Sequence, residues 1–220
     1  VTLQHMFREN KFTIAMIAFT VIFLVGLFYL ASKKDSVSVS GSDTKLLTVQ
    51  PDDWIKGNPD AKLTLIEYLD FECEACGAYY SLIKQISEDF KDDVRFVVRY
   101  FPNPGHANAM TAAVAVEAAG KQGKFWEMHD LLFEKQKEWG EKQQPTPAVF
   151  EAFAEQLGLD MVAFKADVED AHVQERVKRD LNNGIKLGVQ GTPTFFLEDE
   201  KVQIRSYEEF KNKIEVALNR

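Results

Sequence analysis

Apolar positions divide the chain into three zones. Residues 12–31 form twenty positions without a charge, between a short lead at 1–11 and a polar, serine-rich segment at 32–50. As a helix rising about 1.5 Å per residue, this stretch would cross roughly the 30 Å hydrocarbon layer of a bilayer. We therefore predict a transmembrane anchor at 12–31, a linker at 32–50 and one globular domain at 51–220.

A cleaved signal peptide and a buried helix are the alternatives for residues 12–31. The apolar stretch is longer than the usual core of a signal peptide, and no small-x-small pair directly follows it; Ser36 and Ser38 lie several residues further on. Basic residues are balanced on its two sides, so charge does not set the orientation of an anchor.

Within the domain, several apolar runs predict strands. The run at 63–69 is almost continuously apolar, which is typical of a central strand buried on both faces. Strands are also predicted at 45–49 and 94–101, and a helix is predicted from Cys73 to about Phe90.

Helical spacing then dominates from about 106 to 183. Apolar residues recur three and four positions apart, and Thr146-Pro147 and Asp160 are typical helix starts, while Asn183-Gly184 predicts a helix end. Two short strands, 194–197 and 202–204, and a helix capped by Ser206 and Glu209 follow. The order predicts an α/β fold: a small mixed sheet with a helical subdomain inserted at about 106–183.

The charge balance limits the kinds of partner. The chain carries 34 acidic and 26 basic residues, a formal net charge of −8. Nucleic-acid binding would call for a basic stripe, so we expect no nucleic-acid partner. The acidic excess favours solubility.

Both cysteines of the chain lie in one motif, Cys73-Glu74-Ala75-Cys76, between a predicted strand and a predicted helix. This C-x-x-C arrangement is typical of reversible dithiol–disulfide chemistry. The helix N-terminus offers free N–H groups and partial positive charge, which stabilise a thiolate on the first cysteine. We predict that Cys73 is the nucleophile and Cys76 the buried resolving thiol.

Two other interpretations of the pair are open. A purely structural disulfide would close a very short loop and stabilise the fold weakly. Half of a zinc site would need two further ligands, and the dispersed histidines His106, His129 and His172 lack paired ligand spacing. We expect no metal and no cofactor, because the cysteines can carry the electrons themselves.

Glu67 is the lone charge in the apolar strand, six residues before Cys73. Burial of a carboxylate is costly and raises its pKa. A buried acid beneath the cysteines could accept the proton of Cys76, so Glu67 is a candidate catalytic residue. The alternative is an edge strand on which Glu67 reaches water.

The third candidate site is Gly191-Thr192-Pro193, at the entrance of the strand 194–197. A proline at this place can adopt the cis bond. The exposed backbone of Thr192 could then pair with an extended substrate chain, which makes Thr192 and Pro193 candidate substrate-binding residues.

Together these features resemble the DsbA-like thiol:disulfide oxidoreductases of the thioredoxin superfamily. The resemblance covers residues 51–220 and rests on five segments: Tyr68–Cys76, Arg99–Pro102, His106–Ala109, Gln122–Phe133 and Leu187–Phe196. It implies a five-strand thioredoxin core, a cis Pro193 and a buried acid at Glu67. It does not make His106 or His129 catalytic; helix capping or packing is expected for both.

The dipeptide between the cysteines departs from the family, which often has Pro-His there. This chain has Glu74-Ala75, with Asp70 and Glu72 close before it. Nearby carboxylates disfavour a thiolate. We therefore expect the pKa of Cys73 to lie nearer the thioredoxin value of about 7 than the value of about 3.5 found in strong oxidants.

Together with the predicted anchor at 12–31, the resemblance implies a membrane-anchored, extracytoplasmic enzyme that forms disulfides in exported proteins through a Cys73–Cys76 disulfide. A quinone-linked membrane partner, of the DsbB or vitamin K epoxide reductase type, would reoxidise it. Because oxidising cysteine pairs favour compartments outside the cytoplasm, we expect the domain there. The alternatives are a disulfide reductase or isomerase of the same fold, and a chaperone-like peptide-binding module. The branch of the fold that handles glutathione conjugates generally lacks C-x-x-C.

Overall fold

The computed structural model describes residues 16–26, 36–38 and 44–220. The chain divides into two units, Val1–Val37 and Ser38–Arg220, which are described separately. A three-residue strand, β1 (Ser36–Ser38), lies at the boundary between them.

In the first unit, residues 16–26 are helical. Among the residues that the structure describes, no helix has the length and apolar character needed to cross a membrane. This finding corrects the predicted anchor at 12–31 and the membrane-anchored location that rested on it; positions 12–15 and 27–31 lie outside the described residues.

The second unit is built on a sheet with strand order β6-β5-β3-β4-β2. The central strand β3 (Leu63–Leu69) pairs in parallel with β4 (Val94–Tyr100) and antiparallel with β5 (Thr194–Leu197). The outer strands β2 (Trp54–Lys56) and β6 (Glu200–Val202) are both antiparallel to their neighbours. This arrangement confirms the predicted mixed five-strand core.

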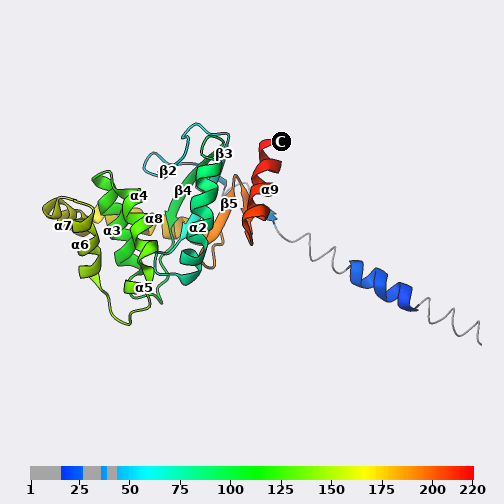
Figure 1. The fold of residues 1–220 in the computed structure, drawn as a ribbon, viewed down its shortest axis with the longest axis horizontal. Coiled ribbons are helices and arrows are strands. Elements are labelled where there is room, and N and C mark those ends of the chain that lie inside the picture. Colours follow the sequence, from blue (N-terminus) through cyan, green and yellow to red (C-terminus); the bar gives the residue numbers. More distant parts are fainter. Residues whose placement is uncertain (1–15, 27–35, 39–43) are drawn as a thin grey trace, which may run out of the picture. The chain divides into compact units, whose positions relative to one another are not determined.

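The sheet is covered on both faces. Because successive side chains of a strand point to opposite faces, β3 contributes to two separate layers of the core. On one face, Leu63 and Leu65 pack with residues of α2 (Glu74–Asp89) and α9 (Tyr207–Leu218). On the other face, Ile66 and Tyr68 pack with Leu47, which lies before β2 in the second unit, and with Leu187 and Val189. Figure 1 shows α2 and α9 together beside the strands.

A helical subdomain is inserted between β4 and β5, as predicted, and Figure 1 shows it as a separate layer beside the sheet. Its apolar core includes the buried side chains of Trp139, Phe150 and Phe164. The subdomain consists of α3 (Ala109–Lys121), α4 (Phe125–Glu134), α5 (Gln136–Trp139), α6 (Pro147–Gln156), α7 (Met161–Glu169) and α8 (Ala171–Lys186).

Several local predictions differ from the structure. The segment predicted as a strand at 45–49 is a 3-10 helix, η1 (Thr44–Leu47), whose Leu47 is buried. Because this segment packs on the domain, the predicted linker does not extend to residue 50. The helix α8 also continues through the predicted stop at Asn183-Gly184. Gly184 is explained by packing and not by a helix end, since the Phe101 and Tyr68 rings leave no room for a larger residue.

A buried network of ion pairs ties the N-terminal segment to the sheet and to α8. Arg99 of β4 pairs with Asp53 at 2.8 Å and donates to the carbonyl oxygens of Leu46 and Thr48. Arg176 of α8 approaches the other oxygen of Asp53 at 3.5 Å. These contacts explain why the segment before β2 lies on the domain.

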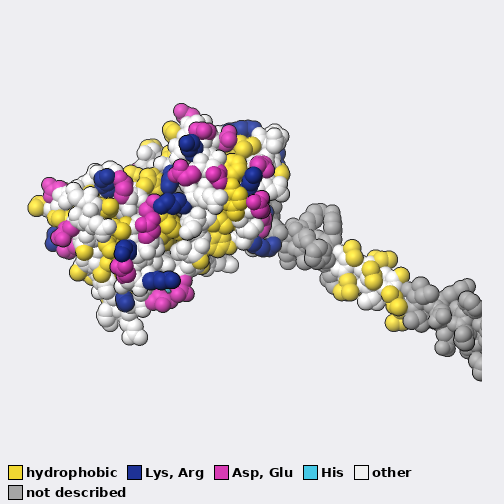
Figure 2. Space-filling model, in the orientation of Figure 1, with side chains coloured by type: hydrophobic (Ala, Val, Ile, Leu, Met, Phe, Trp, Pro, Cys, Tyr) yellow, Lys and Arg dark blue, Asp and Glu magenta, His cyan; other side chains and the backbone are white. Residues whose placement is uncertain are grey.

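The surface is mixed in charge. On the face drawn in Figure 2, acidic and basic side chains are interspersed and no continuous basic stripe is visible.

Candidate redox site at the strand–helix junction

The cysteine pair lies where the central strand meets the first helix of the domain. Strand β3 ends at Leu69, a turn follows, and α2 begins at Glu74 with Cys73 in the extended N-cap position. Both cysteines are free thiols; Cys73 is half-buried and Cys76 is 1% exposed. The junction therefore presents one accessible and one buried thiol, one helical turn apart.

Cys73 is surrounded by groups that stabilise a thiolate. A hydrogen bond with the Cys76 thiol is the main reason that the pKa of Cys73 is lowered to about 5. Burial opposes the shift, while the Thr192 side chain and the N–H groups of Ala75 and Cys76 add to it. As a thiol, Cys73 Sγ lies 3.3 Å from the Thr192 carbonyl oxygen.

A pKa of about 5 is lower than the value near 7 expected from the neighbouring carboxylates. Two of those carboxylates, Asp70 and Glu72, are engaged elsewhere. Glu72 is buried and accepts hydrogen bonds from the backbone and side chain of Asn108. Asp70 accepts from the N–H groups of Glu72 and Asn103 and lies 2.7 Å from His106 Nδ1. Their oxygens thus stabilise the turn, and donors near Cys73 determine its pKa.

The surroundings of Cys76 disfavour its thiolate, in contrast to those of Cys73. Burial is the main cause that raises its pKa well above the ordinary value, and the hydrogen bond to Cys73 and the charge of Glu67 act in the same direction. The pair therefore contains one thiol that ionises readily and one that holds its proton, as the sequence interpretation of their roles requires.

Glu67 is buried on the central strand. Glu67 lies opposite Val98 of β4 and Phe195 of β5. Strand β3 is therefore paired on both sides, and the alternative that Glu67 lies on an edge strand is wrong. The side chain is 8% exposed, and burial raises its pKa to about 8. Near neutral pH this carboxyl is mainly protonated, and it can both give and take a proton.

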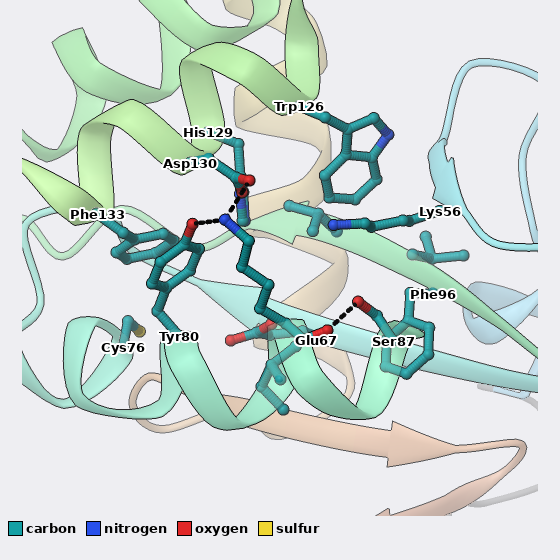
Figure 3. A pocket seen from close by; sticks show the side chains of 14 residues that line it. Lys56, Glu67, Cys76, Tyr80, Ser87, Phe96, Trp126, His129, Asp130 and Phe133 are labelled. Carbon is teal, nitrogen blue, oxygen red and sulfur yellow. Dashed lines mark hydrogen bonds and ion pairs between the residues drawn. The ribbon is translucent and has the colours of Figure 1, made fainter. Parts of the chain in front are cut away.

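Glu67 and Cys76 line the same cavity, seen from close by in Figure 3. Its volume is about 30 Å³, room for about one water molecule. The cavity lies between α2, the sheet and α4, and in Figure 3 His129, Asp130 and Trp126 face Glu67 from the opposite side. A water here could carry a proton between the carboxyl and the thiol.

A polar bridge lies across one side of this cavity. Lys84 Nζ donates to the Tyr80 hydroxyl at 2.7 Å and pairs with Asp130 at 2.9 Å. Tyr80 and Lys84 follow Cys76 at successive four-residue intervals, so all three lie on one face of α2. The bridge joins the helix of the cysteines to α4 of the inserted subdomain.

The loop before β5 faces Cys73. The Thr192–Pro193 peptide bond is cis, as the resemblance implied. A groove of about 400 Å³ begins at this loop; it is lined by Tyr79, Gln190, Gly191, Pro193, Thr194, Phe195 and residues 201–205. Cys73, Cys76, Glu67, Thr192 and Pro193, which were singled out from the sequence, thus come together around one junction.

Two residues of the site were not singled out from the sequence as site residues. Gln136 of α5 donates through its amide nitrogen to the carbonyl oxygens of Phe71 at 2.8 Å and of Cys73 at 2.9 Å. Asn108, fully buried, holds Glu72. Both are polar residues in a stretch with helical periodicity, where spacing alone gives no sign of long-range contacts.

The two histidines of interest are both packed beside the site. His106 contacts Asp70, and His129 lies among aromatic rings, 5.6 Å from Phe71 and 5.1 Å from Phe133 between ring centroids. Burial lowers the pKa of His129. In the part of the chain that the structure describes, no group of three or more His, Cys, Asp or Glu side chains could hold a metal ion.

Comparison with known proteins relates the chain to a sequence family and to solved structures. Residues 49–216 match the sequence model of the family described as Thioredoxin. BdbD from Bacillus subtilis is similar in structure, with 28% identity and a TM-score of 0.68 over 85% of this chain and 100% of that one. α-DsbA1 from Wolbachia pipientis shares the fold at 20% identity, with a TM-score of 0.73 over 80% of this chain and 96% of that one.

Curated relatives with higher identity are much longer proteins. The Na(+)/H(+) antiporter NhaA of Herminiimonas arsenicoxydans is 39% identical over 151 residues, which is 69% of this chain and 23% of the antiporter. NhaA 1 of Salinispora arenicola is 39% identical over 158 residues, 71% of this chain and 23% of that protein. The chain thus spans about a quarter of the length of these relatives.

Proposed function

Because the chain belongs to the thioredoxin family, we propose that it exchanges disulfides with thiols of other proteins at Cys73 and Cys76. Its structural neighbours include a thioredoxin-like oxidoreductase from Silicibacter pomeroyi, at 25% identity and a TM-score of 0.68, and BdbD. The predicted oxidoreductase class is confirmed by these likenesses. The observation that carries the proposal is the pairing of an accessible, low-pKa Cys73 with a buried, high-pKa Cys76.

In the oxidising direction, a substrate thiolate attacks Cys73 Sγ of the Cys73–Cys76 disulfide. The bond between the cysteines breaks, its electron pair stays on Cys76, and a mixed disulfide forms on Cys73. A second substrate thiolate then attacks the substrate's own sulfur in the mixed disulfide, and Cys73 leaves as a thiolate. The substrate loses two electrons and the enzyme gains them as a dithiol. The low pKa of Cys73 makes it a good leaving group.

Glu67 supplies and removes the proton of Cys76. When Cys76 leaves the disulfide it needs a proton, because burial disfavours its thiolate. The Glu67 carboxyl, with a pKa of about 8, can give that proton across the shared cavity and take it back when Cys76 attacks. Thr192 and Pro193 lie beside Cys73, where the backbone of an extended substrate would pass.

The stability of the Cys73 thiolate supports one direction of transfer over the other. A pKa of about 5 for Cys73 lies between the values of about 3.5 and about 7 for a strong oxidant and for thioredoxin. A stabilised thiolate favours the reduced enzyme, so its disulfide is the more oxidising. We therefore favour disulfide formation in substrate proteins over the reductase or isomerase alternative. A quinone-linked partner of the DsbB or vitamin K epoxide reductase type would then restore the disulfide.

The proposal is tested with the oxidised chain and a reduced, unfolded protein that has two thiols. We expect one substrate disulfide to form for each enzyme disulfide consumed, and no transfer by Cys73→Ser. Cys76→Ser should instead accumulate the mixed disulfide when the reduced variant is given an oxidised substrate. Absence of transfer from a chain whose Cys73–Cys76 disulfide is verified by mass would contradict the proposal.

A further inference from the structure

The turn that carries Cys73 is fastened to the inserted subdomain by one amide. Gln136 Nε2 donates to the carbonyl oxygens of both Phe71 and Cys73, at 2.8 and 2.9 Å. The Cys73 carbonyl also accepts the Gly77 N–H at 3.1 Å, the first hydrogen bond of α2. A single side chain of α5 therefore binds the carbonyl oxygen of the nucleophile and that of the residue two positions before it.

Gln136 is well anchored on its own side. Its short helix ends at Trp139, which is fully buried, donates from its indole nitrogen to the Leu132 carbonyl at 3.0 Å and packs edge-on against Phe150. The base of the side chain is therefore held in the core of the subdomain. Movement of α5 would be transmitted to the Cys73 carbonyl.

Gly77 provides the space that the Gln136 amide occupies. A Cβ placed on Gly77 would lie 2.2 Å from Gln136 Oε1 and 2.9 Å from its Cδ, both too close for real contacts. Gly77 is inside α2, where alanine is ordinarily the better helix former by about 1 kcal/mol. The glycine at this position is thus explained by the close approach of Gln136 rather than by the helix.

A second tether holds the same turn. Asn108 donates to the Glu72 carboxylate from its backbone at 2.6 Å and from its amide at 3.3 Å, and its own side-chain oxygen accepts the Thr146 N–H at 2.7 Å. The residue just before Cys73 is therefore fixed by the subdomain as well. Of the two tethers, only Gln136 bonds to Cys73 directly.

We propose that Gln136 is a positioning residue for Cys73, through which the inserted helical subdomain sets the redox equilibrium of the cysteine pair. The inference rests on the proposed dithiol–disulfide exchange. Held by its carbonyl, Cys73 keeps its sulfur within reach of the Cys76 thiol and of the N–H groups of Ala75 and Cys76. These donors stabilise the thiolate, and with it the reduced form of the enzyme.

The test is Gln136→Leu, which keeps the approximate volume and removes both hydrogen bonds. We expect the equilibrium with glutathione to shift about fivefold toward the enzyme disulfide, the effect of roughly one hydrogen bond. The thiolate titration of Cys73, followed by ultraviolet absorbance, should move upward from about 5. A residue with a merely structural role would change stability and leave both readouts in place.

Gln122→Leu is the matched control. Gln122 makes the same kind of paired contact with the turn at Asp160, donating to its carbonyl oxygen at 3.1 Å and accepting its N–H at 2.9 Å. It lies elsewhere in the subdomain, so its loss should reduce stability similarly and leave the glutathione equilibrium within about twofold of the natural chain.

Gly77→Ala displaces Gln136 without altering it, and serves if Gln136→Leu does not fold. Gly77→Ala should shift the glutathione equilibrium toward the enzyme disulfide, as Gln136→Leu does. In a Gln136→Ala background, where the shorter side chain leaves room for the new Cβ, Gly77→Ala should add little further shift. Values for Gln136→Leu and Gly77→Ala within twofold of the natural chain would overturn the proposal. If the natural chain itself does not exchange with glutathione, the proposed function fails instead.

Discussion

At the scale of single residues, burial and hydrogen bonding divide the protons of the site. Cys73 loses its proton readily because the Cys76 thiol and nearby N–H groups stabilise its thiolate. Cys76 and Glu67 hold theirs because both are buried. The separation of these pKa values lets one thiol act as nucleophile and leaving group while the other is served by a neighbouring acid.

The thiolate of Cys73 should titrate near pH 5 in the reduced chain, as measured by absorbance of the thiolate. Since the hydrogen bond with Cys76 is the largest contribution, Cys76→Ala should raise this midpoint by about one unit or more. A midpoint above 7 in the natural chain, or one that Cys76→Ala leaves in place, would contradict the assigned cause.

Replacement of Glu67 by Gln should change the pH dependence of stability. The folded chain holds the Glu67 proton up to a pKa of about 8, whereas the unfolded chain loses it near 4.5. Stability of the natural chain therefore falls as pH rises through this window. The unfolding free energy of Glu67→Gln relative to the natural chain should rise by about 4 kcal/mol between these limits, at roughly 1.4 kcal/mol per unit.

Urea unfolding of the oxidised proteins, in which neither cysteine titrates, measures this difference. A difference that stays constant across the window would show that Glu67 is not held protonated.

At the scale of elements, the fold depends on contacts between segments distant in the sequence. The strand–turn–helix unit of β3 and α2 carries the cysteines, and α5 and α3 hold its turn through Gln136 and Asn108. The segment before β2 is fixed by the buried pair of Arg99 and Asp53, whose side chains are 1% and 0% exposed.

Arg99→Met should destabilise the domain by about 3 to 5 kcal/mol, because it leaves the Asp53 carboxylate buried with fewer partners. Lys165→Met is the control: the exposed pair of Lys165 and Glu151 at 2.8 Å should contribute less than about 1 kcal/mol. Chemical denaturation compares the two. A loss of stability in Arg99→Met as small as that expected for Lys165→Met would mean that the buried pair is not important for stability.

At the scale of the whole molecule, much of the fold could be predicted from the sequence, since β3, β4 and α2 have strong local periodicity. The site residues Cys73, Cys76 and Glu67 stand out because a cysteine motif and a lone charge in a strand are unusual. The short β2 and the role of Gln136 could not be predicted. Both depend on tertiary contacts, which leave no repeating pattern along the chain.

The pKa of about 5 for Cys73 lies below the expected value near 7 and above the value of about 4.5 that would exclude the expectation. Glu72 and Glu74 were expected to disfavour the thiolate, but folding directs the Glu72 oxygens to Asn108. The intermediate acidity of Cys73 predicts a reduction potential between about −120 and about −270 mV, the values of a strong oxidant and of thioredoxin. Equilibration with glutathione measures it, and a value outside this interval would contradict the link from thiolate stability to redox strength.

The central claim is that Cys73 exchanges disulfides with other proteins, and trapping the covalent intermediate tests it most directly. Reduced Cys76→Ser is mixed with a disulfide-bonded protein substrate and analysed by intact mass. We expect a one-to-one adduct through Cys73 that dithiothreitol releases and that Cys73→Ser does not form. No adduct from a Cys76→Ser chain with a verified free, titrating Cys73 thiol would contradict it.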